Sequence, residues 1–162
     1  MFNQRMKYSE IWKIITFFSM GYPEQKQMIG KPSYDYGHFY DRLSDEGNYI
    51  LQLVKMFLYN TFSDFFPHMK SIPTTNNKFA GSLEELCSFI FEGIYKPFLE
   101  IDVLMFEPNE LKNSKKWQYV RKLATDGLLE VELYPVGLKR PIEICLPDYM
   151  YPAPIYNRQD VF

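Results

Sequence analysis

The sequence predicts an α+β fold, with about four helices packed on a small, mainly antiparallel sheet that ends in a C-terminal hairpin. Two patterns in the chain lead to this prediction. Apolar residues recur at helical spacing over much of the chain, but they alternate with polar residues in three short segments, at 99–105, 129–133 and 142–146. No internal repeat or linker divides the 162 residues, so we expect residues 1–162 to form one globular domain.

The first helix is expected over residues 9–19, with Ser9 as its cap. Its apolar face consists of Ile11, Ile14, Ile15 and Phe18. Arg5 and Lys7 precede an apolar run, as in a signal peptide. Lys13 interrupts this run, however, and no small-residue cleavage site follows. We therefore expect this helix to belong to the folded domain.

Two further helices are expected in the middle of the chain. One begins near Asp45, its expected N-cap, and ends before Pro67. Its apolar stripe is Ile50, Leu53, Val54, Phe57 and Leu58. The other helix begins with a capping box formed by Ser82 and Glu85, and we expect Pro97 to end it.

The last third of the chain supplies the expected sheet. Residues 99–105 alternate as a strand. A basic helix over 112–125 is expected to stop at Gly127. The segments at 129–133 and 142–146 then pair as a hairpin.

Composition narrows the classes of function. A net charge of −2 gives the whole molecule no attraction to phosphate backbones. Cys87 and Cys145 are far apart and lack a C-x-x-C partner, which favours a reducing, cytoplasmic location over a disulfide framework. No stretch approaches the roughly 20 uninterrupted apolar residues of a membrane span.

Residues 34–47, YDYGHFYDRLSDEG, contain the densest group of potential ligands in the chain. His38, Asp41, Asp45 and Glu46 offer one nitrogen and three carboxylates. Their spacing matches neither a zinc site nor a calcium loop, so we expect no metal and no cofactor here. The common catalytic motifs are also missing from the sequence, which predicts a protein that is not an enzyme.

One loose match to a catalytic pattern involves Asp102, Glu110 and Lys112, which imitate the acidic and basic residues of metal-dependent nucleases. Such sites require the second acid and the lysine on a strand. Here Pro108 and Asn109 come first and the following residues favour a helix, so we expect no nuclease site.

Basic residues gather near the C-terminal end. The segment RKLATDGLLEVELYPVGLKRPIEI resembles the end of a winged-helix domain, in which a helix is followed by a hairpin with a basic tip. Over residues 112–146, this resemblance implies DNA binding with the helix in the major groove. The residues involved would be Lys115, Lys116, Arg121, Lys122, Lys139 and Arg140. Glu130, Glu132 and Glu143 oppose it, so nucleic-acid binding is the alternative hypothesis.

The same residues 34–47 are better suited to gripping a protein, because tyrosines give large contact areas and acids attract a basic partner. The expected contact residues are Asp35, Tyr36, His38, Tyr40, Asp41, Asp45 and Glu46. The Pro- and Tyr-rich tail at 147–162, expected to be extended, offers a second such surface.

A small, acidic, aromatic-rich chain without a catalytic set resembles the bacterial immunity proteins encoded beside contact-dependent growth inhibition toxins. The resemblance is one of general type and rests on no motif. It implies a stoichiometric inhibitor that binds a cognate toxin domain, often a basic nuclease, and blocks it by steric occlusion and charge complementarity.

Overall fold

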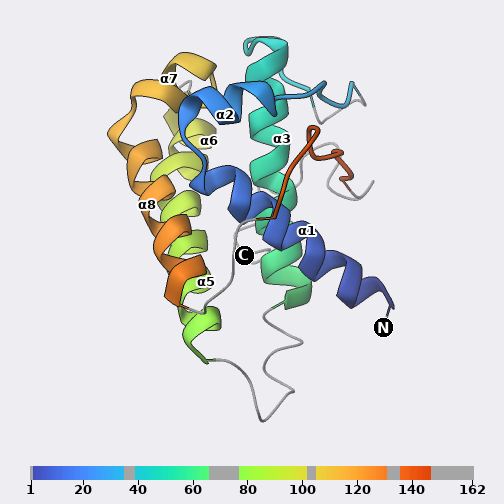
Figure 1. Ribbon diagram of the computed structural model, residues 1–162. Helices are drawn as coiled ribbons and strands as arrows, with labels where there is room; N and C mark the ends of the chain where they lie inside the picture. Colours follow the sequence, from blue (N-terminus) through green and yellow to red (C-terminus); the bar gives the residue numbers. More distant parts are fainter. Residues whose placement is uncertain (1, 35–38, 66–76, 102–104, 131–135, 147–162) are drawn as a thin grey trace.

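A computed structural model describes residues 2–34, 39–65, 77–101, 105–130 and 136–146 of the chain (Figure 1). Within these ranges the chain is mostly helical and contains no strand, so the predicted α+β fold with a sheet and a C-terminal hairpin was wrong. None of the helices described is long and apolar enough to cross a membrane.

The described residues form a succession of helices along the chain. Their bounds are α1 Phe2–Ser19, α2 Tyr22–Gln27, α3 Asp45–Tyr59, the π-helix η1 Asn60–Phe65, α5 Asn77–Ile90, the π-helix η2 Phe91–Tyr95, α6 Lys96–Ile101, α7 Pro108–Asn113 and α8 Lys115–Glu130.

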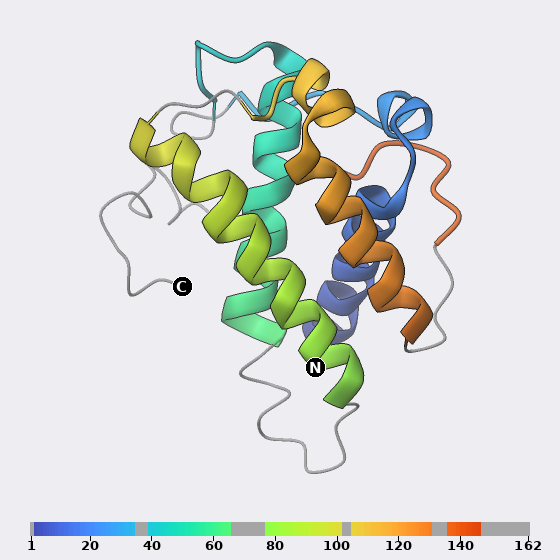
Figure 2. The ribbon, with the colours of Figure 1, turned by 90° about the vertical axis from the view of Figure 1, so that its left-hand side faces the viewer.

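The core lies between four long helical segments, which we call rods: α1, α3 with η1, α5 with η2 and α6, and α8 (Figures 1 and 2). Helix α5 packs along α8, α8 packs along α1, and α1 packs against α3 and η1. Phe18 lies at their junction, with its ring 5.2 Å from that of Phe57 and 6.1 Å from that of Trp117. The Trp117 indole is buried and donates a 2.6 Å hydrogen bond to the Met105 carbonyl, which satisfies its polar atom.

The third rod differs from its predicted bounds at both ends. Helix α5 begins at Asn77, so Ser82 lies inside the helix and does not cap it. The rod also continues past Pro97 through η2 and α6. Because Pro97 has no N–H, the Gly93 carbonyl has no donor four residues ahead of it. The ammonium of Lys116 on α8 donates to this carbonyl at 2.7 Å.

The residues 99–105 were predicted to form a strand, but α6 runs through Ile101 and residues 102–104 lie outside the described ranges. Alternation over so few positions also fits the end of a helix that is partly buried. Phe98, one residue earlier, is buried and makes an edge contact with Phe106 at 5.2 Å. The described apolar residues here, Phe98, Leu99 and Met105, therefore pack in the core of a helical structure rather than on a sheet.

Helix α8 does not stop at Gly127, as the sequence predicted, but continues to Glu130. Its buried positions Trp117, Val120, Ala124 and Leu128 keep the helical period across the glycine. The first predicted strand of the hairpin thus begins inside a helix, and residues 131–133 lie outside the described ranges.

The predicted return strand, residues 142–146, has no regular secondary structure. It belongs to segment 136–146, which lies against α1 and α3 (Figure 1). The Val136 amide donates to the Thr16 hydroxyl at 3.0 Å, and the Tyr49 hydroxyl donates to the Ile142 carbonyl at 2.7 Å. Ile142 is buried and its neighbours Pro141 and Glu143 are exposed. The alternation therefore marks a chain with one face on helices, not a strand in a sheet.

Candidate protein-binding surface

The predicted contact residues separate into two environments. Asp41, Asp45 and Glu46 are exposed at the N-terminal end of α3. Tyr40 is half-buried, with its ring in an edge contact with Phe98 at 5.3 Å. It therefore serves the core more than a surface. Asp35, Tyr36, His38 and the tail at 147–162 lie outside the described residues.

The sequence predicted Asp45 as the N-cap of α3, but the helix is capped by Ser44. The Ser44 hydroxyl accepts a 3.0 Å hydrogen bond from the Gly47 amide. The same hydroxyl donates to Glu107 at 2.8 Å, and the Ser44 amide donates to the same carboxylate oxygen at 3.1 Å. Glu107 therefore supplies negative charge at the positive end of the α3 dipole.

The loop before α3 is held by two amide side chains of that helix. Asn48 Oδ1 accepts from the Tyr40 amide at 2.7 Å, and Asn48 Nδ2 donates to the Tyr40 carbonyl at 2.8 Å. In the same way, Gln52 Oε1 accepts from the Ser33 amide at 2.6 Å, and Gln52 Nε2 donates to the Ser33 carbonyl at 2.8 Å. Each amide thus satisfies both backbone polar groups of one loop residue, as a neighbouring strand would.

Lys55 continues this polar row one turn further along α3. Its side chain is 1% exposed, and its Nζ lies 5.2 Å from the centre of the Tyr40 ring, within cation–π range. Burial lowers the pKa of Lys55 to about 8. The half-buried Tyr40 ring is thus packed between Lys55 and Phe98.

Sequence reasoning missed Asn48, Gln52 and Lys55, because an amphipathic pattern normally places such polar positions in water. They follow the spacing i, i+4, i+7, and every residue from Gly47 to Leu58 is buried. One signal could have shown this. Lys55 is the single charged residue between those limits, which is unusual for a helix with a solvent face.

Tyr34 completes the exposed part of the surface. It is 60% exposed, and its ring lies 5.0 Å from that of Phe39. A hydrogen bond between its hydroxyl and the Asp45 carboxylate raises the pKa of Tyr34. Tyr34 and three exposed carboxylates make up what we call the acidic face: Tyr34, Asp41, Asp45 and Glu46. Arg42 and Ser44 are exposed between these acids.

The alternative basic residues do not form one DNA-binding surface. Arg121 is half-buried and donates to the Met20 carbonyl and to Gln25 Oε1, both at 2.6 Å. Lys122 pairs with Asp126 at 2.8 Å. Lys115 and Lys116 are exposed on α8.

The other two basic residues of that set, Lys139 and Arg140, are exposed on segment 136–146. In Figure 1 this segment lies well apart from α8. The winged-helix resemblance also predicts a hairpin after the basic helix. In the part of that segment which the structure describes, residues 129–130 are helical and residues 136–146 form no strand, so no hairpin is present there.

Other candidate chemistry is sparse in the described part of the chain. No three His, Cys, Asp or Glu side chains there lie together as a possible metal site. Glu110 and Lys112 lie on the helix α7, and Asp102 is outside the described residues.

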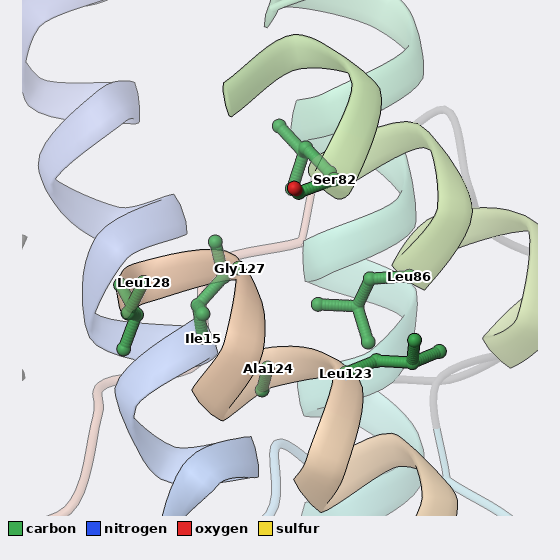
Figure 3. Close-up of a pocket in the computed structure, with 8 residues that line it drawn as sticks. Ile15, Ser82, Leu86, Leu123, Ala124, Gly127 and Leu128 are labelled. Carbon is green, nitrogen blue, oxygen red and sulfur yellow. The ribbon is translucent and has the colours of Figure 1, made fainter. Parts of the chain in front are cut away.

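A pocket between α1, α5 and α8 is lined mainly by apolar side chains (Figure 3). It holds about one water molecule at most, and its walls include Ser82 and Gly127. It is therefore a small packing gap in the core rather than a ligand site.

Comparison of the chain with protein-family models, curated proteins and solved structures finds no match.

Proposed function

We propose that the chain is a non-catalytic protein-binding module that holds a basic partner on its acidic face. The observation that carries the proposal is the support beneath that face. The exposed carboxylates lie beside backbone positions that are held at Ser33 by Gln52, at Tyr40 by Asn48 and at Ser44 by Glu107.

Fixing the loop in advance favours binding. A flexible loop must lose conformational entropy when a partner arrives, whereas a loop already held by hydrogen bonds loses little. Asp41, Asp45 and Glu46 attract positive charge, which raises the rate of encounter with a basic partner. Tyr34 adds a large exposed ring whose position is set by Phe39 and Asp45.

The more specific form of the proposal is an immunity protein that neutralises a cognate toxin domain, such as a nuclease. A nuclease carries a basic cleft for the phosphates of its substrate. Carboxylates held on a rigid surface would take the place of those phosphates and block access to the cleft. The mechanism needs one immunity chain for each toxin domain and no turnover.

The partner is sought by co-expressing the chain with the C-terminal domain of the protein encoded directly upstream, followed by co-purification and calorimetry. We expect a one-to-one complex whose affinity falls as salt increases. The triple change Asp41→Lys, Asp45→Lys and Glu46→Lys should weaken binding at least tenfold and flatten the salt dependence.

The matched control changes three exposed acids away from the acidic face: Glu24→Lys, Glu84→Lys and Glu143→Lys. It alters the net charge equally, so it reports the effect of overall charge alone. Equal losses in the two triple variants, or unchanged affinity in the first, would show that the acidic face is not the contact surface. Circular dichroism confirms that both variants fold.

A further inference from the structure

Helices α5 and α8 run antiparallel and meet along an exposed line of paired residues. Phe89 lies beside Tyr119, with ring centres 4.7 Å apart in an edge contact. One turn away, Lys116 donates to the Gly93 carbonyl. In the other direction, Glu85 lies near Lys122, whose pKa is raised by Asp126 first and also by this carboxylate. We call these six residues the α5–α8 seam.

The seam combines an aromatic centre with charges of opposite sign on its two helices. Tyr119 is 41% exposed, although Phe89 beside it is half-buried. Glu85 supplies an acid on the α5 side, and Lys116 and Lys122 supply bases on the α8 side. In Figure 2 both helices face the viewer, and no other described helix lies in front of them.

Two copies of such a surface can meet about a twofold axis in two simple ways. An axis across the helices places α5 on α5 and α8 on α8 with their levels reversed, so that Lys116 of each copy faces Lys122 of the other. An axis along the helices places α5 of each copy on α8 of the other, so that acids face bases. Like charges in contact repel, and therefore only the second arrangement is favourable.

We propose that the α5–α8 seam is a self-complementary contact through which two copies of this chain form a dimer. An axis along the helices keeps each residue at its own level. Two residues that are neighbours across the seam within one chain therefore also face each other from opposite chains of the dimer. Phe89 faces Tyr119 of the partner subunit, which gathers four rings. Glu85 faces Lys122 of the partner subunit. Both side chains of the existing Lys122–Asp126 ion pair are exposed, so this pair opposes the new contact only weakly.

The test is sedimentation equilibrium on the full chain at low salt. We expect the mass to rise from that of one 19.4 kDa chain toward twice this value between roughly 10 µM and 1 mM. Tyr119→Ser should weaken self-association at least tenfold without changing the circular dichroism, because the side chain is exposed.

Exchanging the charges of Glu85 and Lys122 tests whether α5 of one copy lies on α8 of the other. Glu85→Lys alone, or Lys122→Glu alone, places like charges opposite each other twice in the dimer, and each should weaken association about tenfold. The double variant with both changes should return to within about threefold of the wild type. Glu84→Lys, an exposed neighbour outside the seam, is the control and should have no effect.

A chain that stays monomeric up to roughly 1 mM overturns the proposal, whether the seam is then covered by another segment or by a different protein. A dimer that tolerates Tyr119→Ser, or a double charge exchange that fails to restore association, also overturns it. The proposal does not depend on the acidic face, so either can fail while the other stands.

Discussion

Gly47 leaves open the space that the Glu107 carboxylate occupies beside the first turn of α3. A Cβ atom added at Gly47 would overlap Oε1 of Glu107, the oxygen that accepts both hydrogen bonds from Ser44. Residues 60 positions apart in sequence are thereby fitted to each other: the absence of a side chain at Gly47 makes room for the carboxylate that Ser44 holds.

This relationship predicts that Gly47→Ala has opposite effects in two backgrounds. In the wild type the new methyl group displaces the Glu107 carboxylate, and the lost hydrogen bonds should outweigh the better helix propensity of alanine, with a net loss of about 1 kcal/mol. In a Glu107→Ala background the same change should stabilise α3 by about 0.5 kcal/mol. Urea denaturation of the four chains measures the coupling. Additive effects would show that the two residues do not meet.

Replacing Asn48 should release the loop before α3. Asn48→Leu removes four hydrogen bonds, to the Tyr40 amide and to the carbonyls of Tyr40, Leu43 and Ser44. The Tyr40 and Ser44 carbonyls keep the bonds that they accept from the Leu43 and Asn48 amides. We expect a loss of about 3 kcal/mol in the free energy of unfolding. Hydrogen exchange should show faster exchange of the Tyr40 amide. The exposed Asn113→Leu is the control, and similar losses in both variants would contradict the assignment.

Lys55 should make the stability depend on pH. Its pKa is lowered by burial to about 8, so between pH 8 and its ordinary value of 10.5 the unfolded chain binds more protons than the folded chain. Stability from this group therefore rises with pH across that window, and the full cost of burying the charge is present below pH 8. Relative to wild type, Lys55→Met should lose about 2 kcal/mol of stability between pH 7 and pH 10.

The comparison with Lys55→Met is needed because other groups also titrate at high pH. Burial raises the pKa of Tyr49, Tyr95 and Cys87, so these groups reduce stability as the pH approaches their ordinary values. Their contribution is the same in both chains and cancels in the difference. A difference between the two chains that does not change with pH would show that Lys55 is not buried as a charge.

Gly127→Ala should stabilise the protein, although the sequence marks Gly127 as a helix stop. The residue lies inside α8, and a Cβ there would meet Ser82 Cβ at 3.4 Å, an ordinary contact. Alanine improves helix propensity, so we expect a gain of about 0.5–1 kcal/mol in thermal or urea denaturation. A clear loss would mean that α5 and α8 pack too closely for a methyl group.

Random duplex DNA at low salt should give no mobility shift with this chain. Arg121 is engaged by Met20 and Gln25, and Lys139 and Arg140 lie well apart from α8, so the basic residues cannot act as one surface. A shift that disappears in Lys115→Ala and Lys116→Ala would revive nucleic-acid binding, because non-specific binding depends on the number of phosphates neutralised.

Local signals in the sequence located the long helices but not all of their bounds. The stripe beginning at Ile50 lies in α3, and most of the predicted basic helix lies in α8. Helix α1 begins at Phe2 rather than Ser9, and the short helices α2 and α7 were not predicted. What failed were the signals for ends and strands. Gly127 and Pro97 normally break helices, but here tertiary packing and the bond from Lys116 compensate for them.

The predicted strands failed for a related reason. Alternating exposure requires only a flat surface on one side of an extended chain. In segment 136–146 that surface is formed by α1 and α3 through contacts such as Tyr49 with Ile142. The exposed acids of the candidate site could be predicted from composition and turn residues. Glu107, distant in sequence, could not, because its role depends on how α7 docks beside α3.

Asn48 and Gln52 grip the loop by its backbone and make no demand on the side chains that the loop presents. Residues 34 and 41 can therefore be exchanged for others without loosening the anchors at Ser33 and Tyr40. In a surface built in this way, the residues that fix the backbone are different from the residues that contact a partner. Its contact residues are free to diverge as a partner changes, while the helix that holds the loop stays the same.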